Sequence, residues 1–140
     1  VLTGGFEGVI DAKSRVVLPS KLRSALGDDF HLMMGFGPYV AIYPQENYEE
    51  MLSQLMSMKK SSDEYLTLGR YLLGNAFDGD YDSAGRVLIP PVLKKHGNLE
   101  KEVRIMGVGD HIEIWSKENY EKNCILNEES LNDARQLMNY

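Results

Sequence analysis

Cysteine, long apolar runs and leader segments are all scarce in this sequence of 140 residues. Cys124 is the only cysteine, so the chain can form no internal disulfide and no cysteine-based zinc site, and a reducing cytoplasm is the expected location. No apolar run approaches the roughly 20 residues that a membrane-spanning helix requires, so we expect no membrane span. The chain opens without a basic segment followed by an apolar one, so we also expect no secretory signal.

The patterns that typically mark enzymes are missing too. The three histidines, His31, His96 and His111, are scattered and lack the spacing of metal ligands. The sequence has no Walker-type phosphate loop, and the Gly-Val-Gly stretch at 107–109 is more typical of a hairpin turn than of a nucleotide cradle. Cys124 lies in an acidic tail without the context of a nucleophile. We therefore expect no catalytic residues, no metal, no cofactor and no small-molecule substrate.

Positive charge is in the minority but is concentrated in two places. The formal net charge of −6 argues mildly against nucleic-acid binding, because most such domains are basic. Residues 11–23 nevertheless carry a net charge of +3 and residues 82–97 carry +2, whereas residues 45–66 carry −3. An anionic partner responds to the distribution of charge rather than to its sum. The two basic islands are therefore candidate binding sites, and a solvated surface of uneven charge is the alternative.

The two basic islands contain the same phrase. Residues 11–19 read DAKSRVVLP, and residues 82–90 read DSAGRVLIP, at an offset of 71. The same offset continues on both sides of the phrase, in the pairs Phe6 and Phe77, Gly8 and Gly79, and Leu22 and Leu93. With one residue inserted in the second copy, the match extends to Gly35 and Gly107, to Gly37 and Gly109, and to the Asn-Tyr-Glu triplets at 47–49 and 119–121. A solenoid needs at least three stacked units. We therefore expect two copies that share one core through an internal pseudo-twofold axis.

The expected division places the first copy and its following helix at residues 1–60, a connecting helix at 61–74, and the second copy with a C-terminal helix at 75–140. Each copy is predicted to begin with a strand (6–10 and 77–81), a turn and a buried strand (16–18 and 87–89). Short helices follow at 20–26 and 91–95, the first with Ser20 as its N-cap. Two further strands in each copy (30–34 and 40–43, 103–106 and 112–115) are expected to form hairpins.

The repeated turn has the form Asp-x-x-(Ser/Gly)-Arg. An aspartate side chain accepts hydrogen bonds from nearby backbone N–H groups, and Gly85 tolerates a positive φ that costs more at Ser14. Helical spacing of apolar residues predicts further helices around 51–58, around 65–73 and in the tail from residue 117. Core packing is the ordinary role of such stripes, and contact with a neighbouring subunit is the alternative, above all in the Met-rich helix 51–58.

These residues resemble the MraZ family of bacterial transcriptional regulators, which is related to the AbrB-type (SpoVT-AbrB) swapped-hairpin proteins. The resemblance is carried by Asp11, Lys13, Arg15 and Pro19 in the first copy, by Asp82, Gly85, Arg86 and Pro90 in the second, and by Gly107-Val108-Gly109 with Ile112-Glu113-Ile114-Trp115 after it. It covers nearly the whole chain. The first copy departs from the family pattern in having Ser14 where glycine usually precedes the arginine.

The resemblance implies an α+β fold in which two tandem AbrB-like repeats form one pseudo-twofold β-barrel with peripheral helices. It implies a ring-shaped homo-oligomer of about eight to twelve subunits. It implies sequence-specific binding to double-stranded promoter DNA with direct repeats, upstream of the division and cell-wall gene cluster, mainly as a repressor. It also implies a cytoplasmic, nucleoid-associated location.

Arg15 and Arg86 have two interpretations. In the structural one, each arginine pairs with its own aspartate, Asp11 or Asp82, and fixes the turn. In the functional one, the guanidinium is offered to a phosphate or to guanine O6 and N7. The two are compatible, because an aspartate can orient an arginine toward DNA.

The first copy is the favoured DNA reader, because its turn contains Lys13 where the second copy has Ala84. The candidate DNA-binding residues are Lys13, Arg15, Lys21 and Arg23, and the secondary motif with a turn or assembly role, and a possible DNA contact, is Asp11, Asp82 and Arg86. The alternative function is that of an AbrB-superfold antitoxin-like or scaffolding protein whose main ligand is another protein.

Overall fold

Every strand and short helix of the first half has a counterpart in the second half of the computed structural model, which describes residues 1–140. The first half contains β1 (Leu2–Val9), β2 (Arg15–Val17), α1 (Ser20–Leu26), β3 (Phe30–Met34) and β4 (Tyr39–Pro44). The second half repeats this order as β5 (Phe77–Asp78), β6 (Arg86–Leu88), α4 (Pro91–Gly97), β7 (Glu102–Gly109) and β8 (Ile112–Ser116).

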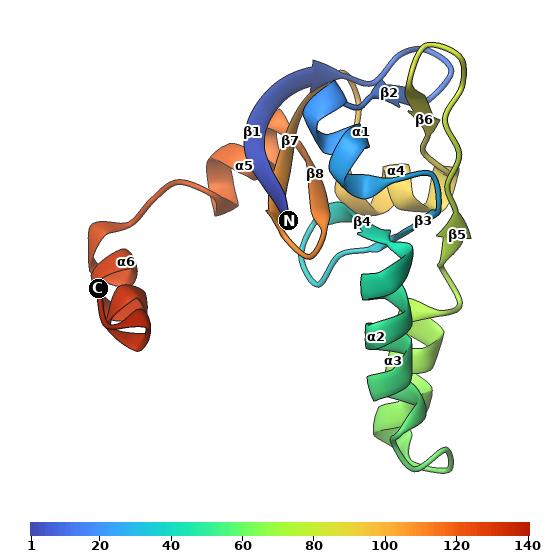
Figure 1. The fold of residues 1–140 in the computed structure, drawn as a ribbon, viewed down its shortest axis with the longest axis vertical. Helices are drawn as coiled ribbons and strands as arrows, with labels where there is room; N and C mark the ends of the chain where they lie inside the picture. Colours follow the sequence, from blue (N-terminus) through green and yellow to red (C-terminus); the bar gives the residue numbers. More distant parts are fainter.

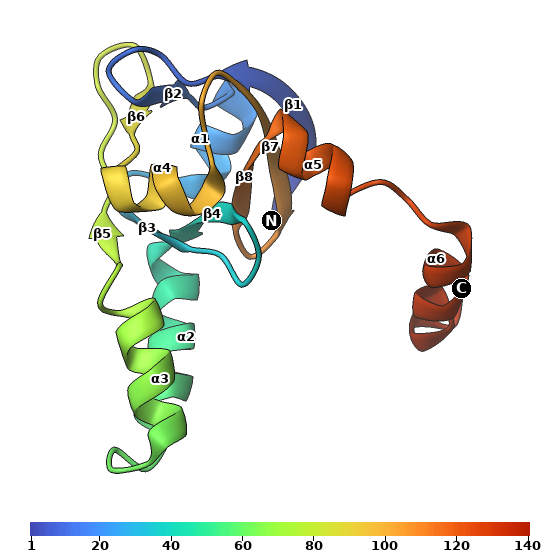
Figure 2. The same cartoon turned by 180° about the vertical axis from the view of Figure 1, so that it is seen from behind.

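The helices that follow the two sets of strands differ. After β4, the helices α2 (Gln45–Met56) and α3 (Asp63–Leu72) form a hairpin that protrudes from the strands (Figures 1 and 2). After β8 comes the short helix α5 (Lys117–Asn123), and the chain then leaves the body before α6 (Glu128–Arg135) and the 3₁₀ turn η1 (Gln136–Met138) (Figure 1). None of the helices has both the length and the apolar character that crossing a bilayer requires.

The strands form two antiparallel sheets with a symmetric order. The six-stranded sheet has the order β1-β7-β8-β4-β3-β5, and exchanging each strand for its counterpart reverses this order onto itself. The central pair is β4 with β8, and the separate two-stranded ribbon pairs β2 with β6, so both pairs join a strand to its own counterpart. The expected α+β class is therefore confirmed, with strands of the two halves interleaved in one sheet.

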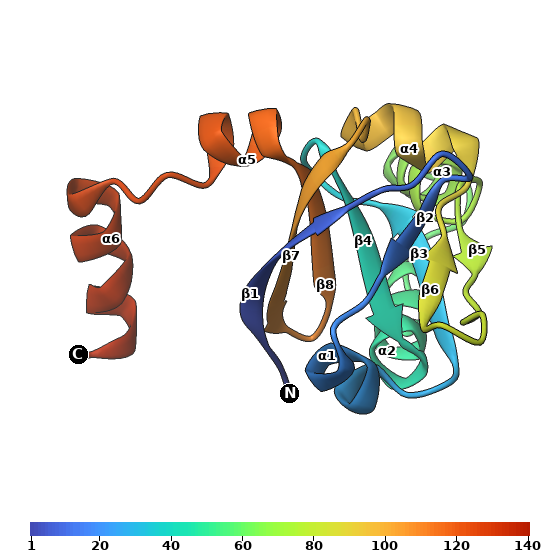
Figure 3. The ribbon, with the colours of Figure 1, turned by 90° about the horizontal axis from the view of Figure 1, so that it is seen from above.

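The strands curve around a common core but do not close into the expected barrel (Figure 3). The large sheet keeps two edges, β1 and β5, and only isolated bridges, Ile10 to Val16 and Tyr81 to Val87, link the ends of these edge strands to the ribbon. Both ribbon strands have three residues and β5 has two, so no continuous ladder forms at either corner. The barrel expectation was wrong on this point.

The core lies inside this curved wall. Val16 and Val87, which face each other across the ribbon, are fully buried, as are Leu22 of α1 and Leu93 of α4. The main cluster contains 18 buried apolar residues drawn from both halves, so neither half has a core of its own. A second, smaller cluster of Met33, Leu55 and Leu72 lies between β3 and the α2–α3 hairpin.

Several local expectations were wrong. Pro19, not Ser20, occupies the N-cap of α1, and no side chain caps this helix. The strand predicted at 77–81 is limited to Phe77–Asp78. Gly107 lies inside β7 rather than in a turn, because β1 approaches so closely that a Cβ atom there would come within 2.6 Å of the backbone nitrogen of Thr3.

Candidate nucleic-acid interface

Both repeated turns are built around an aspartate. The Oδ1 atom of Asp11 accepts the backbone N–H groups of Lys13 and Arg15, each at 2.9 Å, and Oδ2 accepts the Nε–H of Arg15 at 2.9 Å. Asp82 accepts the N–H groups of Ala84 and Arg86 at 2.9 Å in the same way, and the Nε–H of Arg86 at 2.6 Å. Each aspartate thus fixes both the turn and the arginine that follows it.

These hydrogen bonds also lower the pKa of both aspartates. The pKa of Asp11 is lowered, first because its carboxylate accepts the backbone N–H of Arg15, and further by the side chain of Arg15 and the N–H of Lys13. The pKa of Asp82 is lowered for the same reasons by Arg86 and Ala84. The predicted structural pairing of aspartate and arginine is therefore present in both copies.

The position before each arginine has a left-handed backbone, with a φ of 62° at Ser14 and 73° at Gly85. The difference in residue type follows from what lies against each turn. A Cβ atom at Gly85 would overlap the guanidinium of Arg23, so a side chain there would force this guanidinium to move. At Ser14 the neighbour is Lys94, whose Nζ donates a hydrogen bond to the serine Oγ at 3.2 Å.

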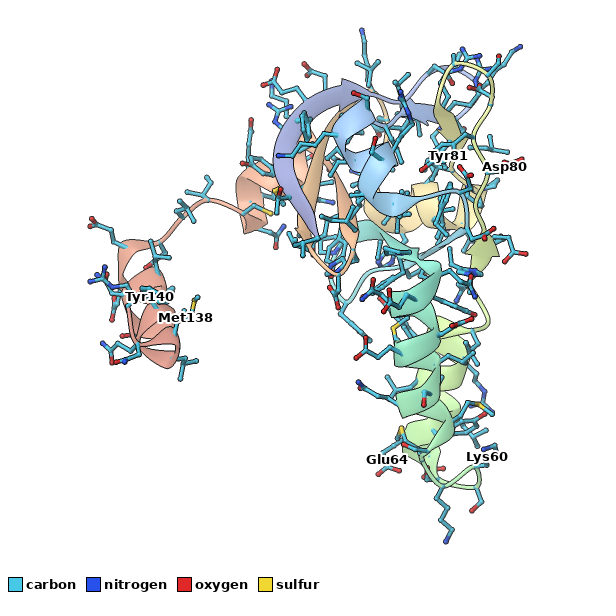
Figure 4. The ribbon with its side chains drawn as sticks, in the orientation of Figure 1. Lys60, Glu64, Asp80, Tyr81, Met138 and Tyr140 are labelled. Atoms are coloured by element: carbon cyan, nitrogen blue, oxygen red, sulfur yellow. The ribbon has the colours of Figure 1, made fainter.

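The helices are therefore crossed relative to the turns: α1 of the first half lies against the second turn, and α4 of the second half lies against the first turn. Arg23 comes from the first half but lies against the second turn, where it lines a hollow with Tyr81, Asp82 and Gly85. Tyr81 occupies this corner together with the exposed Asp80 (Figure 4). Lys94 comes from the second half but lies against the first turn, beside Lys95 and Ser14. Arg23 and Lys94 are equivalent positions at the offset of 71.

This crossing divides the predicted binding set. Lys13 and Arg15 stay together at the first turn, with Lys13 exposed and the Arg15 side chain 27% exposed. The exposed Lys21 lies beside Gly4 of β1, and Arg23 donates to the backbone oxygen of Leu18 at the second turn. Lys94 completes the cluster at the first turn and was missed by sequence reasoning. Its equivalence to Arg23 at the offset of 71 is the sequence signal that marks this position.

The ribbon between the two turns has one buried and one exposed face. Arg15 lies opposite Leu88, and Val17 lies opposite Arg86. Val17 and Leu88 are 51% and 61% exposed, and both arginines are about one-third exposed. The outer face is thus a strip with two oriented guanidinium groups and two apolar side chains. Arg15 also has its Nη1 atom 3.8 Å from Asp82, so it faces both carboxylates.

Such a strip fits the chemistry of nucleic-acid recognition. A two-stranded ribbon can enter the major groove, arginine can bind guanine or phosphate, and apolar side chains can contact thymine methyl groups. Each guanidinium has five N–H donors, and the hydrogen bond to aspartate uses one of them. Orientation by the aspartate reduces the conformational freedom that the arginine would lose on binding.

The three histidines lie in unrelated surroundings. His31 contacts Asp78 at 3.1 Å, and His96 contacts the backbone oxygen of Gly37 at 2.8 Å. His111 lies between Asp110 and Glu113, at 2.7 and 3.0 Å. Burial disfavours the charged form of His111, but the hydrogen bonds to Glu113 and Asp110 outweigh it and raise its pKa. No group of three or more histidine, cysteine, aspartate or glutamate side chains is arranged to hold a metal ion.

Comparison with known proteins places these features in a family. The family model described as "MraZ protein, putative antitoxin-like" matches residues 1–70 and again residues 72–138. The chain is 37% identical over 130 residues to a protein named "Transcriptional regulator MraZ" from Lachnoclostridium phytofermentans, which covers 93% of this chain and 92% of the relative. Proteins of the same name from Thermoanaerobacter pseudethanolicus and Mycoplasma mobile are 36% and 35% identical, over 87% and 95% of this chain and 85% and 92% of their own lengths.

Proposed function

Since this chain belongs to the MraZ family, we propose that it is a transcriptional regulator that binds promoter DNA through the β2–β6 ribbon and the two Asp-centred turns. The observation that carries the proposal is the outer face of the ribbon, where Asp11 and Asp82 orient Arg15 and Arg86 beside two exposed apolar side chains. The name of the relatives, transcriptional regulator, supports the same role.

The first turn is the principal DNA reader in this proposal. It combines Lys13, Arg15 and, from the crossed helix, Lys94 and Lys95, whereas the second turn has the small residues Ser83 and Ala84 at its tip and uses Arg23 for an internal hydrogen bond. Arg15 and Lys13 reach base edges or phosphates, and Lys21 and Lys94 neutralise phosphates. Arg86 and Asp82 mainly hold the second turn in shape.

Assembly resolves the conflict between DNA binding and a net charge of −6. In a ring of about eight to twelve subunits with head-to-tail contacts, identical basic turns recur in one direction. Direct repeats in a promoter match such an arrangement, whereas palindromes match a twofold dimer. Linked sites also raise the effective concentration of each turn near its repeat. The subunit itself contains two units, 1–60 and 75–140, joined by residues 61–74, and the double match of the family model, to 1–70 and 72–138, supports two units in one chain.

The regulated promoter in this proposal is that of the division and cell-wall gene cluster, where the protein acts as a repressor at the nucleoid. Binding to promoter DNA with direct repeats is measured by fluorescence anisotropy, with a scrambled duplex as the competitor. Arg15→Ala should weaken specific binding by 10-fold or more, in line with about 1–3 kcal/mol for a bidentate arginine contact.

Two matched variants make this measurement specific. Arg86→Ala occupies the equivalent position in the second copy and should weaken binding much less, while Lys59→Ala removes a charge from the tip of the α2–α3 hairpin and should leave affinity unchanged. All three must keep the ring mass of the wild type by light scattering. Equal losses from Arg15→Ala and Arg86→Ala would refute the asymmetry, and unchanged affinity in both would refute the ribbon as the DNA-binding surface.

A second candidate function is that of an antitoxin-like protein whose main ligand is another protein. The description of the family model favours it, as does the acidic α2–α3 hairpin, which presents an apolar groove lined by Phe36, Met51 and Leu68. Affinity purification that yields a stoichiometric protein partner and no enrichment of promoter DNA would support this function over the first.

A further inference from the structure

The two ends of the large sheet have equivalent contacts on their outer faces. On β3, His31 pairs with Asp78 at 3.1 Å and stacks on Tyr48, with ring centroids 3.8 Å apart. On β7, Arg104 pairs with Glu7 at 3.3 Å and lies 5.7 Å from the ring centroid of Tyr120. Each triad joins a side chain of the inner strand, an acid of the edge strand and a tyrosine of the following helix. The two outer faces are therefore true counterparts.

The face in the first half is covered. Met33 is two residues beyond His31 on β3, and it is fully buried by Leu55 of α2 and Leu72 of α3. Ala76, just before β5, packs against the same cluster. The hairpin α2–α3 thus adds a second helix, α3, against this side of the sheet, while most of the hairpin projects away from the strands (Figure 2).

The counterpart face in the second half is open. Met106, two residues beyond Arg104, is only partly buried, and Val108 is 45% exposed. Gly5 occupies the place of Ala76, and nothing lies within 4 Å of the position that its Cβ would take. A hollow of about 250 Å³ results, lined by Gly5, Phe6, Glu7, Arg104, Met106 and Tyr120. The helix α5 ends at Asn123, before it can supply the cover that α2 and α3 supply in the first half.

The chain does contain a helix at the matching place in its order, and this helix is uncovered. Residues 125–140 are all exposed, and they include Leu126 (82%), Leu137 (91%) and Met138 (69%). Leu131 lies in the middle of α6 and is 49% exposed. The linker after α5 is extended and carries α6 away from the strands, so that Met138 and Tyr140 contact no part of the body (Figure 4).

We propose that α6 of a second copy covers the outer face of β1 and β7, with Leu131 seated in the hollow beside Met106. Two apolar surfaces that are unpartnered within one chain are thereby paired between chains. Glu128 precedes Leu131 by three residues on the same face of α6, so it comes to the side of the hollow that presents Arg104. The extended linker directs α6 outward rather than back onto α5, which favours the neighbouring chain as the recipient.

Each chain gives one arm and receives another in this arrangement. Such a heterologous contact closes into a ring when the rotation between subunits divides a full turn. The inference rests on the proposed function, because it names a contact that holds the proposed ring together. The arm and the hollow are unlike surfaces, so the contact also fixes the same direction for every subunit around the ring.

Cysteine cross-linking tests the contact directly. In a Cys124→Ser background, one chain carries Met106→Cys and a second, differently tagged chain carries Leu131→Cys. After co-expression, bismaleimidoethane should link the two chains in good yield, while Met106→Cys paired with Lys59→Cys should remain unlinked. No cross-link between the two chains in an assembled ring, or a yield no higher than that of the Lys59→Cys control, would overturn the proposal.

A second pair of variants tests whether the contact holds the ring. Leu131→Asp should lower the assembled mass measured by light scattering, whereas Asn132→Asp, the adjacent position on the same helix, should not. Both positions are exposed in the single chain, so neither variant disturbs its fold, and circular dichroism checks this. Rings that persist in Leu131→Asp would overturn the contact alone, while a wild type that is monomeric would refute the proposed ring as well.

Discussion

In each Asp-centred turn, the left-handed residue contacts a basic side chain from the helix of the opposite half. Mutation can exchange this pair of residues between the two turns. At the second turn the pair is Gly85 with Arg23, and at the first turn it is Ser14 with Lys94. Gly85→Ser places a side chain at a φ of 73°, which costs about 1–2 kcal/mol. The new Cβ also displaces the guanidinium of Arg23 from the carbonyl oxygen of Leu18, a hydrogen bond of a charged donor worth about 1.5–3 kcal/mol. The total loss of stability should be about 2.5–5 kcal/mol.

The double variant Gly85→Ser/Arg23→Lys recreates the pair found at the first turn. Arg23→Lys alone loses the hydrogen bond to Leu18 and should cost about 1.5–3 kcal/mol. In the double variant this bond is lost only once, and the lysine gains the serine Oγ as its acceptor. The double variant should therefore be more stable than the sum of the single variants predicts, by about 2 kcal/mol, which is a coupling typical of residues in contact.

Urea unfolding of the four proteins at one fixed protein concentration measures this coupling, because assembly contributes to the apparent stability of an oligomer. Ser14→Gly serves as the control. It relieves the backbone strain at 62° but loses the hydrogen bond from Lys94, so its stability should stay within about 1 kcal/mol of the wild type. Additive costs in the Gly85 and Arg23 variants would refute the idea that the crossed helix decides which residue each turn tolerates.

Further predictions concern DNA affinity, pH and packing. Lys94→Ala should weaken binding to specific and scrambled duplexes alike and reduce the slope of log K against log salt by about 1, measured by anisotropy between 50 and 200 mM salt, because a phosphate contact releases counterions; an unchanged slope would remove Lys94 from the interface. The pKa of His111 is raised, so the stability from its protonated form is complete below its unfolded pKa near 6.5 and is lost as the pH rises through the folded value. The urea concentration at the unfolding midpoint should thus decrease when the pH is raised from 6 to 8 in the wild type, and it should decrease less in His111→Gln. Met33→Ala should cost about 2–5 kcal/mol in thermal or urea unfolding, because this side chain is fully buried under Leu55 and Leu72; a loss below 1 kcal/mol would contradict the packing described for the hairpin.

The repeated phrase predicted the equivalence of the two halves, because residues that must satisfy the same turn and the same buried strand retain the same types. The Asp11 and Asp82 turns, the buried Val16 and Val87, and the short helices after Pro19 and Pro90 were all predicted from these local constraints. Ser20 was assigned as a cap by its residue type alone, but Pro19 already holds the extended backbone that starts the helix, with a φ of −54°.

The crossing of α1 and α4 could not be predicted in this way. Pattern and propensity describe neighbours along the chain, whereas Arg23 at Gly85 and Lys94 at Ser14 are contacts between segments about 60 and 80 residues apart in sequence. The prediction of a closed barrel was wrong for a related reason. Closure depends on how many backbone hydrogen bonds form at the two corners where the edge strands meet the β2–β6 ribbon. The exposed position of α6 could not be predicted either, because the helical spacing of apolar residues indicates an apolar face and not what that face packs against.

The reversed strand order has a consequence for synthesis on the ribosome. Leu2 pairs with Gly109 and Val9 with Glu102, so β1 is made first but receives its partner only when β7 has emerged. Until then, an eight-residue strand carries unsatisfied backbone groups, and most of the future core lacks the residues that bury it. The nascent chain therefore cannot fold one half at a time. Because β1 stays unpaired until β7 has been made, it is exposed to pairing with strands of neighbouring nascent chains in a polysome.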